Sequence, residues 1–197
     1  MKRALTIDTS TSKTTVGVVE NGAVIWTDSV EGATSHGGAL GALIECAQGL
    51  DVVDHVIVGM GPGPFTGLRV GIIFVQGFAK ARNLPCIGVV SLDAIAQSVE
   101  LRSESVISID ARRKERYWAR YDATGERISE IAVSKIDEVP AGISDQHPTP
   151  LGLVKAANNP RSIRQTPIYL RKPDAALAPL SGVTLRELRF FDLGEIL

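Results

Sequence analysis

The strongest constraint on the fold is a loop of glycines and prolines that joins a buried strand to an apolar helix. The strand pattern ends at Met60, and the loop runs from Gly61 to Gly67 with prolines at 62 and 64. Glycines supply positive φ in tight connections, and prolines limit flexibility. A rigid connection is the commoner interpretation of such a loop, and a phosphate-binding turn is the alternative.

The loop matches neither of the common phosphate-binding patterns. A P-loop needs a Gly-Lys pair, and none follows Gly61. The dinucleotide pattern needs a third glycine at the position of Thr66. Pro62 and Pro64 also remove backbone N–H donors, on which a phosphate cradle depends. The sequence therefore predicts a loop whose role is its shape.

The helix predicted after the loop, Leu68 to Ala81, is apolar around nearly its whole circumference. Only Arg69, Gln76 and Lys80 interrupt it. A helix that is apolar all round is buried all round. Because a chain of this length has few elements to cover the outer face, a second chain is the simplest cover, and a layer of the protein's own is the alternative.

A second helix is expected over His36 to Leu50, with Leu40, Leu43 and Ile44 at core spacing. Its first turns are made of small residues. They are Gly37, Gly38, Ala39, Gly41 and Ala42. Glycines weaken a helix but allow another backbone to approach closely. This pattern is a second indication of a packed interface.

The order of the remaining elements predicts a mixed α/β fold with a duplication. Strands are expected at 3–7, 14–20, 23–30, 55–60 and 85–90, with Ser91 as the cap of a helix over 92–101. The pattern restarts with strands at 105–110, 116–123 and 127–134, a helix at 151–158 and an extended stretch at 167–171. Three antiparallel strands followed by alternating helix and strand indicate a ribonuclease-H-like lobe, so the second lobe is a trimmed copy.

Composition excludes several classes of protein. The 21 basic and 22 acidic residues give a net charge of −1, which offers no footprint for autonomous nucleic-acid binding. Cys46 and Cys86 form no metal or redox spacing and are expected to be reduced thiols of a cytoplasmic protein. No secretory signal and no apolar run of membrane-spanning length occurs, so no membrane partner is expected.

Two stretches could carry chemistry. Asp8-Thr9-Ser10 follows the first strand, where hydroxyls and a carboxylate could bind phosphate and metal, or could form a hydrogen-bonded hairpin end. A nucleotide would need a second glycine-rich loop between 138 and 167, and only two separated glycines occur there. An independent ATPase is therefore not expected. The three histidines are scattered, so no metal site is expected.

The second stretch is a basic turn that consists of Asp110-Ala111-Arg112 with Arg113, Lys114 and Arg116, beside Tyr117 and Trp118. It could contact an RNA backbone or an acidic partner. A solvated hairpin loop is the commoner explanation.

Four motifs occur together and in order: Asp8-Thr9-Ser10, the sequence GPGPFTGLRVG from 61 to 71, Asp110-Ala111-Arg112 before a Tyr-Trp strand, and PIYLR at 167–171. Together they resemble the TsaB (YeaZ) family, the dimerisation subunits of the bacterial tRNA threonylcarbamoyladenosine machinery, over about residues 3–173. Pro64 replaces the family's usual serine, and the second lobe lacks a segment before its last helix.

The resemblance implies an actin/hexokinase-like (ASKHA) fold of two ribonuclease-H-like lobes. The N-terminal lobe spans residues 1–102 and contains the dimerisation helices, and the reduced C-terminal lobe spans residues 103–173. Residues 174–197 form a linker and a tail that resembles the start of a RimI-type N-acetyltransferase, as if the chain were cut from a fusion or kept a relic of one.

The resemblance also implies a non-catalytic, cytoplasmic scaffold. Its partner TsaD transfers threonylcarbamoyl to the adenosine next to the anticodon of tRNAs that read codons beginning with A, and the ATPase TsaE joins them. A homodimer is expected when the chain is alone, and tRNA is expected to be reached only through the complex. No metal and no cofactor of its own is expected, and a shared nucleotide at the joint with TsaD is possible.

The implied site residues fall into three groups. The partner interface is His36, Leu40, Leu43, Ile44, Arg69, Val70, Ile73, Phe74, Gly77 and Phe78. The family loop is Gly61, Pro62, Gly63, Phe65, Thr66 and Gly67, and the degenerate phosphate turn is Asp8, Thr9 and Ser10. Two enzyme classes remain as alternatives: an autonomous metallopeptidase-like protein and a sugar-kinase-like enzyme.

Overall fold

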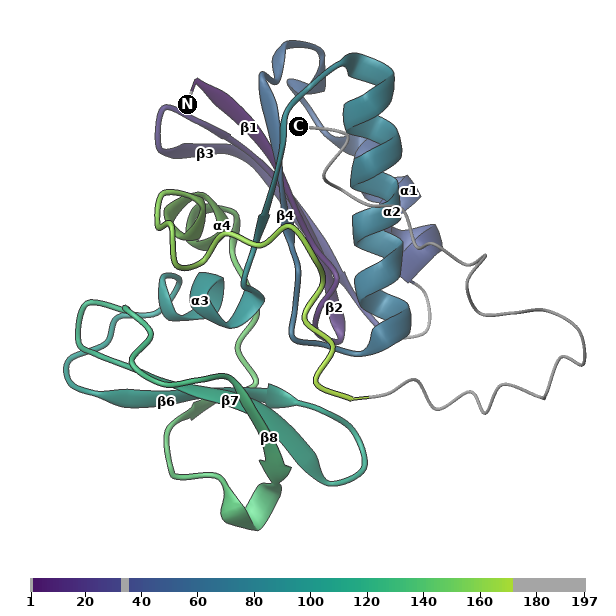
Figure 1. Ribbon diagram of the computed structural model, residues 1–197. Coiled ribbons are helices and arrows are strands. Elements are labelled where there is room, and N and C mark those ends of the chain that lie inside the picture. Colours follow the sequence, from purple (N-terminus) through teal and green to yellow (C-terminus); the bar gives the residue numbers. More distant parts are fainter. Residues whose placement is uncertain (1, 33–35, 172–197) are drawn as a thin grey trace, which may run out of the picture.

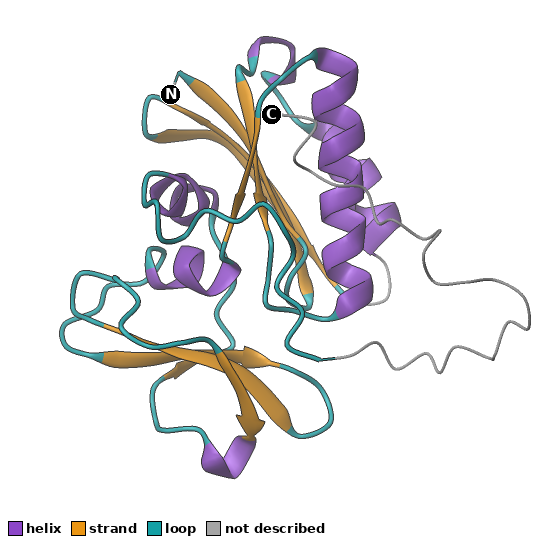
Figure 2. Cartoon of the chain, in the orientation of Figure 1, coloured by secondary structure: helices purple, strands orange, loops and turns teal. Residues whose placement is uncertain are grey.

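The computed structural model describes residues 2–32 and 36–171, which form two sheets and the helices around them (Figures 1 and 2). The strands are β1 (Arg3–Asp8), β2 (Lys13–Glu20), β3 (Ala23–Glu31), β4 (His55–Gly59), β5 (Cys86–Val89), β6 (Ser105–Asp110), β7 (Glu115–Tyr121), β8 (Ala132–Lys135) and β9 (Ile143–Ser144). The helices are α1 (His36–Cys46), α2 (Phe65–Arg82), α3 (Ser91–Ala96) and α4 (Pro150–Ala157), with single 3-10 turns at Leu50–Val52 and Ile136–Glu138. The expected tail at 174–197 lies outside the described residues.

The first sheet has the strand order β3-β2-β1-β4-β5. Strand β1 is central, antiparallel to β2 and parallel to β4. Helices α1 and α2 cover one face of this sheet, and α4 covers the other (Figure 1). Because both faces are covered, β1 is buried from Ala4 to Asp8, which accounts for its nearly continuous apolar sequence.

The second sheet repeats the first four positions of that order as β8-β7-β6-β9. Where the first lobe has α1, between its third and fourth strands, the second lobe has only the 3-10 turn at Ile136–Glu138. Helices α3 and α4 pack against each other between the two sheets (Figure 1). The prediction of an actin/hexokinase-like α/β fold of two ribonuclease-H-like lobes, the second one trimmed, is confirmed.

Several element boundaries differ from the sequence-based expectation. Helix α1 ends at Cys46 because the chain must pass through Gly49, whose φ of 78° is left-handed. Helix α3 ends at Ala96, five residues earlier than expected. Just after this end, the Ser98 hydroxyl donates a hydrogen bond to the Ala94 carbonyl and forms another with the Thr149 hydroxyl. Strand β8 begins at Ala132 instead of residue 127, and Arg127 forms only an isolated bridge with Tyr121 of β7.

Ser91 was expected to cap α3, and this expectation is wrong. The helix has no side-chain cap, and the residue at its N-cap position is Val90. The Ser91 hydroxyl is instead used in a buried network with β1 and the glycine-proline loop. None of the helices among residues 2–32 and 36–171 has both the length and the apolar character to cross a bilayer.

Candidate partner interface

The inner and outer faces of α2 have different surroundings. Leu68 and Val75 are fully buried against the first sheet. Ile73, on the outer side, is 64 % exposed. Phe74 and Phe78 are half-buried and stack on each other with their ring centroids 6.0 Å apart. Among the described residues, no layer of the chain covers the outer face, so the expectation that the helix is buried all round does not hold within one chain.

Glycines distinguish the same two faces. A Cβ atom at Gly67 would lie 2.6 Å from the Thr9 carbonyl oxygen, and one at Gly71 would lie 2.4 Å from the Thr9 hydroxyl. On the outer side, added Cβ atoms would meet nothing within 4 Å. These outer glycines are Gly37, Gly38 and Gly41 of α1 and Gly77 of α2. Glycine within a helix costs about 1 kcal/mol relative to alanine, and the chain's own packing does not require it at these positions.

Helices α1 and α2 lie side by side, and this contact brings together the residues predicted for the interface. Ile73 and Gly77 are exposed on the outer surface. The half-buried members are Ile44, Arg69, Val70, Phe74 and Phe78. We call these seven residues, with the α1 glycines, the α1–α2 face.

Three residues predicted for the interface are instead part of the chain's own interior. Leu40 and Leu43 of α1 are 1 % and 3 % exposed and belong to the core of the first lobe. His36 is buried, and its Nδ1 atom lies 2.7 Å from the Thr14 hydroxyl oxygen. Burial, with a smaller effect of the Arg112 charge, lowers the pKa of His36. The helical spacing that identified these positions marks the buried face of α1.

The turn after β1 is closed by internal hydrogen bonds. One carboxylate oxygen of Asp8 accepts from the Ser10 amide (2.8 Å) and hydroxyl (2.7 Å). The other accepts from the Ser91 hydroxyl at 2.8 Å. The Gly61 amide in turn donates to the Ser91 oxygen at 3.1 Å. Burial raises the pKa of Asp8, although these bonds act against the rise.

The family loop covers that turn directly. A Cβ atom at Gly63 would lie 2.3 Å from the Ser10 carbonyl oxygen, and the Thr9 hydroxyl donates to the Gly67 carbonyl at 2.7 Å. Asp8, Thr9 and Ser10 are each at most 1 % exposed. The polar atoms of the turn are therefore enclosed by the loop, and the arrangement is a hydrogen-bonded hairpin end. The remaining loop members, Pro62, Phe65 and Thr66, are buried, half-buried and exposed, respectively.

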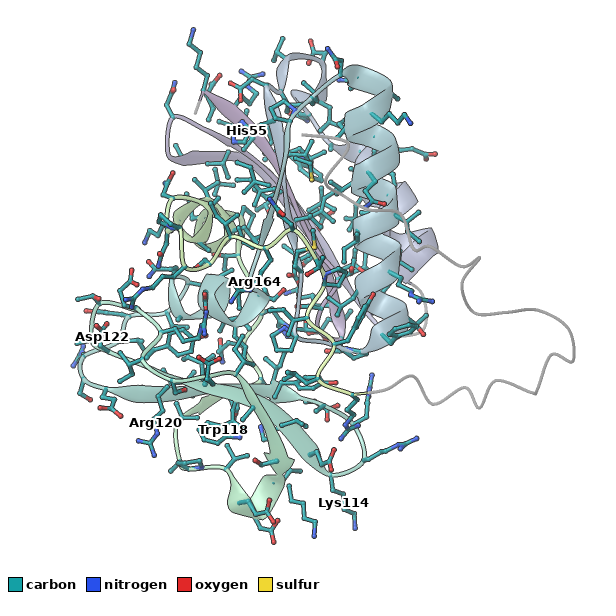
Figure 3. All side chains as sticks on the ribbon, in the orientation of Figure 1. His55, Lys114, Trp118, Arg120, Asp122 and Arg164 are labelled. Atoms are coloured by element: carbon teal, nitrogen blue, oxygen red, sulfur yellow. The ribbon has the colours of Figure 1, made fainter. Side chains whose placement is uncertain are left out.

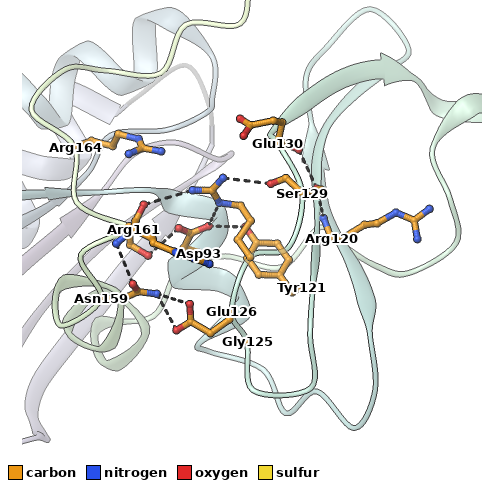
Figure 4. Close-up of polar contacts among 12 residues, drawn as sticks. Asp93, Arg120, Tyr121, Gly125, Glu126, Ser129, Glu130, Asn159, Arg161 and Arg164 are labelled. Carbon is orange, nitrogen blue, oxygen red and sulfur yellow. Dashed lines mark hydrogen bonds and ion pairs between the residues drawn. The ribbon is translucent and has the colours of Figure 1, made fainter.

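Sequence reasoning did not identify a second buried network, which joins the two lobes (Figure 4). The carboxylate of Asp93 accepts hydrogen bonds from Tyr121, Arg127 and Ser162 at 2.7, 2.9 and 2.7 Å. Asp93 is 4 % exposed. Its sequence position indicated only a favourable charge in the first turn of a helix, because its partners lie at least 28 residues further along the chain.

No group of three or more His, Cys, Asp or Glu side chains that could hold a metal ion occurs among residues 2–32 and 36–171. The His147 ring lies 2.8 Å from the Thr11 hydroxyl. His36 and His55 lie in separate parts of the first lobe, one in α1 and one in β4.

Comparison with known proteins identifies the family. The family model described as TsaD, tRNA N6-adenosine threonylcarbamoyltransferase, matches residues 40–188. An uncharacterized protein of Mycobacterium tuberculosis (strain H37Rv) is 35 % identical over 87 % of this chain and 92 % of its own length. A protein of Mycobacterium leprae is 36 % identical over 89 % of this chain and 56 % of its own length.

The relatives with assigned names include TsaB proteins. The tRNA threonylcarbamoyladenosine biosynthesis protein TsaB of Escherichia coli K12 is 42 % identical over 35 % of this chain and 31 % of its own length. The structure of YeaZ from Pseudomonas aeruginosa superimposes with a TM-score of 0.70, at 25 % identity, over 86 % of this chain and all of that one. The chain therefore belongs to the TsaD family and, within it, to the TsaB (YeaZ) proteins.

Proposed function

We propose that this chain is a non-catalytic scaffold subunit of the cytoplasmic machinery that makes threonylcarbamoyladenosine in tRNA. In this role it pairs with a TsaD-type transferase through the α1–α2 face, and a TsaE-type ATPase completes the assembly. The chain forms a homodimer through the same face when it is alone. The observation that carries the proposal is the outward-facing combination of apolar and glycine positions on two adjacent helices.

Burial of the α1–α2 face supplies the energetic reason for pairing. Apolar surface removed from water contributes about 25 cal/mol per Å², and Ile73 alone is 64 % exposed. Packed helices lie roughly 8 to 10 Å apart, depending on the side chains at the contact. Gly41 and Gly77 present no side chain there, so a partner helix can approach at the short end of that range.

The family relationship supports a TsaD-type partner over an unrelated one. The family model that matches this chain describes the TsaD transferases themselves. The partner is therefore expected to have the same sheet order and corresponding helices. Two chains with related surfaces can meet about an approximate two-fold axis, as in an isologous dimer. The same surface then accounts for both the homodimer and the heterodimer.

The closed turn supports a scaffold role. Asp8, Thr9 and Ser10 are enclosed, and their polar atoms are bonded within the chain. A nucleotide at the joint with the partner would therefore take its phosphate contacts mainly from the partner. Among the described residues, no observation favours the metallopeptidase-like or kinase-like alternatives over the scaffold.

Native mass spectrometry of the chain alone, and mixed with the TsaD protein of the same organism, tests the proposal. We expect a homodimer that exchanges into a one-to-one heterodimer. Ile73→Glu is the informative variant because Ile73 is exposed, so the change introduces a charge into the interface without disturbing the core. Phe74 and Phe78 pack against the core, which makes charge substitutions there harder to interpret.

Ile128→Glu is the matched control. Ile128 is 50 % exposed and lies in the second lobe, away from α1 and α2. Loss of both dimers in Ile73→Glu but not in Ile128→Glu supports the proposal. A chain that stays monomeric and does not bind TsaD contradicts it.

A further inference from the structure

A pocket of about 220 Å³ lies where the two lobes meet at the family loop. It is formed by residues 63–64 of the loop and 65–66 of the first turn of α2, by 111–113 of the basic turn with Tyr117, and by 169–171. The charged residues that line it are all arginines: Arg112, Arg113 and Arg171. No carboxylate is among the lining residues, although the whole protein is slightly acidic. The lining of the pocket is therefore locally basic.

The basic turn has an unusual backbone. Arg112, Arg113 and Lys114 have successive φ angles of 62°, 56° and 60°, all in the left-handed region. Each such non-glycine residue is strained, and strained residues of this kind cluster at functional sites. Glycine or asparagine would adopt this turn at lower cost. Here the turn instead holds three exposed cations, with Lys114 at the end of the β6–β7 hairpin (Figure 3).

Aromatic rings line the pocket beside these arginines. The rings of Phe65 and Tyr169 have centroids 4.8 Å apart and are tilted by 47°. The Arg69 guanidinium lies 3.7 Å from the centroid of the Phe65 ring. Tyr169 is 40 % exposed, so it can offer a ring face to a planar group. Arginine beside an exposed aromatic ring is the combination that binds the phosphate and base of an unstacked nucleotide.

Arg112 and Arg171 differ in how firmly their neighbours hold them. Arg112 forms an ion pair with Asp110 at 3.4 Å, in which both side chains are more than half exposed. Exposed pairs of this kind contribute little to stability, so a phosphate can compete with the carboxylate. Arg171 is held by an ion pair with Glu115 and by a bond to the Ala111 carbonyl at 3.0 Å. We expect Arg112 to exchange partners and Arg171 to stay in place.

We propose that this pocket binds one nucleotide of an unpaired RNA segment, with a phosphate on Arg112 and Arg113 and the base against Tyr169. Pockets for whole small-molecule ligands measure about 300 to 1,000 Å³, so the volume favours part of a polymer over a free ligand. A pocket of 220 Å³ fits only a part of a larger molecule. The identification of that molecule as RNA, rather than an acidic protein, rests on the proposed function and on the aromatic ring.

Fluorescence anisotropy tests the proposal with the complex of this chain and the same organism's TsaD. The probe is a labelled, unmodified tRNA transcript that reads a codon beginning with A. Arg112→Gly is the main variant, because glycine removes the charge and accepts the positive φ. Loss of one phosphate contact should reduce the slope of log K against log salt by about 0.7, which is roughly fivefold in affinity near 0.1 M salt.

Arg120→Ala is the matched charge control. Arg120 is exposed on β7, at the other end of the same hairpin, and pairs with Glu104 (Figure 3). Its removal should leave the salt slope unchanged. Tyr169→Leu should weaken binding about tenfold with an unchanged slope, because base stacking is lost. Tyr169→Phe keeps the ring and should bind like the wild type.

Each outcome decides the assignment. If the slope of log K against log salt is the same for Arg112→Gly, Arg120→Ala and the wild type, the RNA assignment is wrong. If Arg112→Gly leaves RNA binding unchanged but reduces binding of TsaD or TsaE, the pocket contacts an acidic protein and the RNA assignment is wrong. If no heterodimer forms, the proposed function fails. The RNA contact is then tested separately by the slopes of log K against log salt for this chain and its variants without TsaD.

Discussion

The hydroxyl of Tyr121 donates a 2.7 Å hydrogen bond to the carboxylate of Asp93, which joins β7 of the second lobe to α3 of the first (Figure 4). Arg127 and Ser162 donate to the same carboxylate, so donors from three separate segments surround one buried anion. Tyr121 is fully buried, and burial beside Asp93 raises its pKa well above the ordinary value. The relative position of the two lobes, and of the pocket between them, therefore depends on this network.

Tyr121→Phe should lower the free energy of unfolding by about 1 to 2 kcal/mol. The change removes one donor to a buried charge, and hydrogen bonds to charged groups are worth about 1.5 to 3 kcal/mol. Arg127 and Ser162 still satisfy Asp93 in part. Urea denaturation measures the loss. Tyr169→Phe, at a position 40 % exposed, is the control, and an equal effect of both variants would contradict the role of the network.

Gly77→Ala should stabilise the isolated chain and weaken its complexes. A Cβ atom at Gly77 meets nothing within 4 Å, so alanine gains helix propensity of about 0.5 to 1 kcal/mol without a clash. The same methyl group would stand between α2 and a partner helix. Denaturation of a dilute monomer and native mass spectrometry of the TsaD mixture measure the two effects. An unchanged heterodimer would show that the partner does not approach Gly77 closely.

Asp8→Asn should change the pH dependence of stability in a defined direction. Burial raises the pKa of Asp8 above its ordinary value of 3.8. Between that value and the raised pKa, the folded protein holds a proton that the unfolded chain has released, so the free energy of unfolding falls as the pH rises. Wild type should therefore lose stability relative to Asp8→Asn as the pH rises above 3.8.

Asp122→Asn provides a control of opposite sign when the free energy of unfolding is compared across pH. The hydrogen bond from the Thr124 hydroxyl, with backbone donors, lowers the pKa of Asp122. Its stabilisation is present above 3.8 and is lost as the pH falls through the lowered value. Wild type should gain stability relative to Asp122→Asn as the pH rises. Slopes of the same sign for both variants would contradict the assignment for Asp8.

The two thiols should differ in reactivity. Burial raises the pKa of Cys86 to about 11, whereas Cys46 is exposed at the end of α1. At pH 8 only about one Cys86 in a thousand is then a thiolate, the form that reacts. Intact-mass analysis after brief maleimide treatment should show one modification, and peptide mapping should place it on Cys46. Modification of Cys86 at a similar rate would contradict its burial.

Local pattern predicted most of the first lobe and the two helices whose outer faces the described chain leaves uncovered. The Asn21-Gly22 turn and the strand alternation each specify their structure within a few residues and occur where they were expected, whereas α2 begins at Phe65, three residues before the expected Leu68. The apolar residues around nearly the whole circumference of α2, together with the glycines of α1, also indicated that the outer faces of these two helices are not covered by the chain. The same periodicity could not separate the two faces of α1, which is why buried Leu40 and Leu43 were included among the interface residues.

The sequence alone determined the fold class, the family and the presence of a surface on α1 and α2 that the chain leaves uncovered, because these depend on short-range pattern and on contiguous motifs. Only the tertiary structure decided which residues of those helices face outward, that Asp8 is closed off through Ser91, and that Asp93 joins the lobes. It also brought the start of α2 at Phe65, the basic turn at Arg112 and the segment at Tyr169 around one pocket. Contacts of this kind join residues 28 to 83 positions apart, and no local periodicity encodes such pairings.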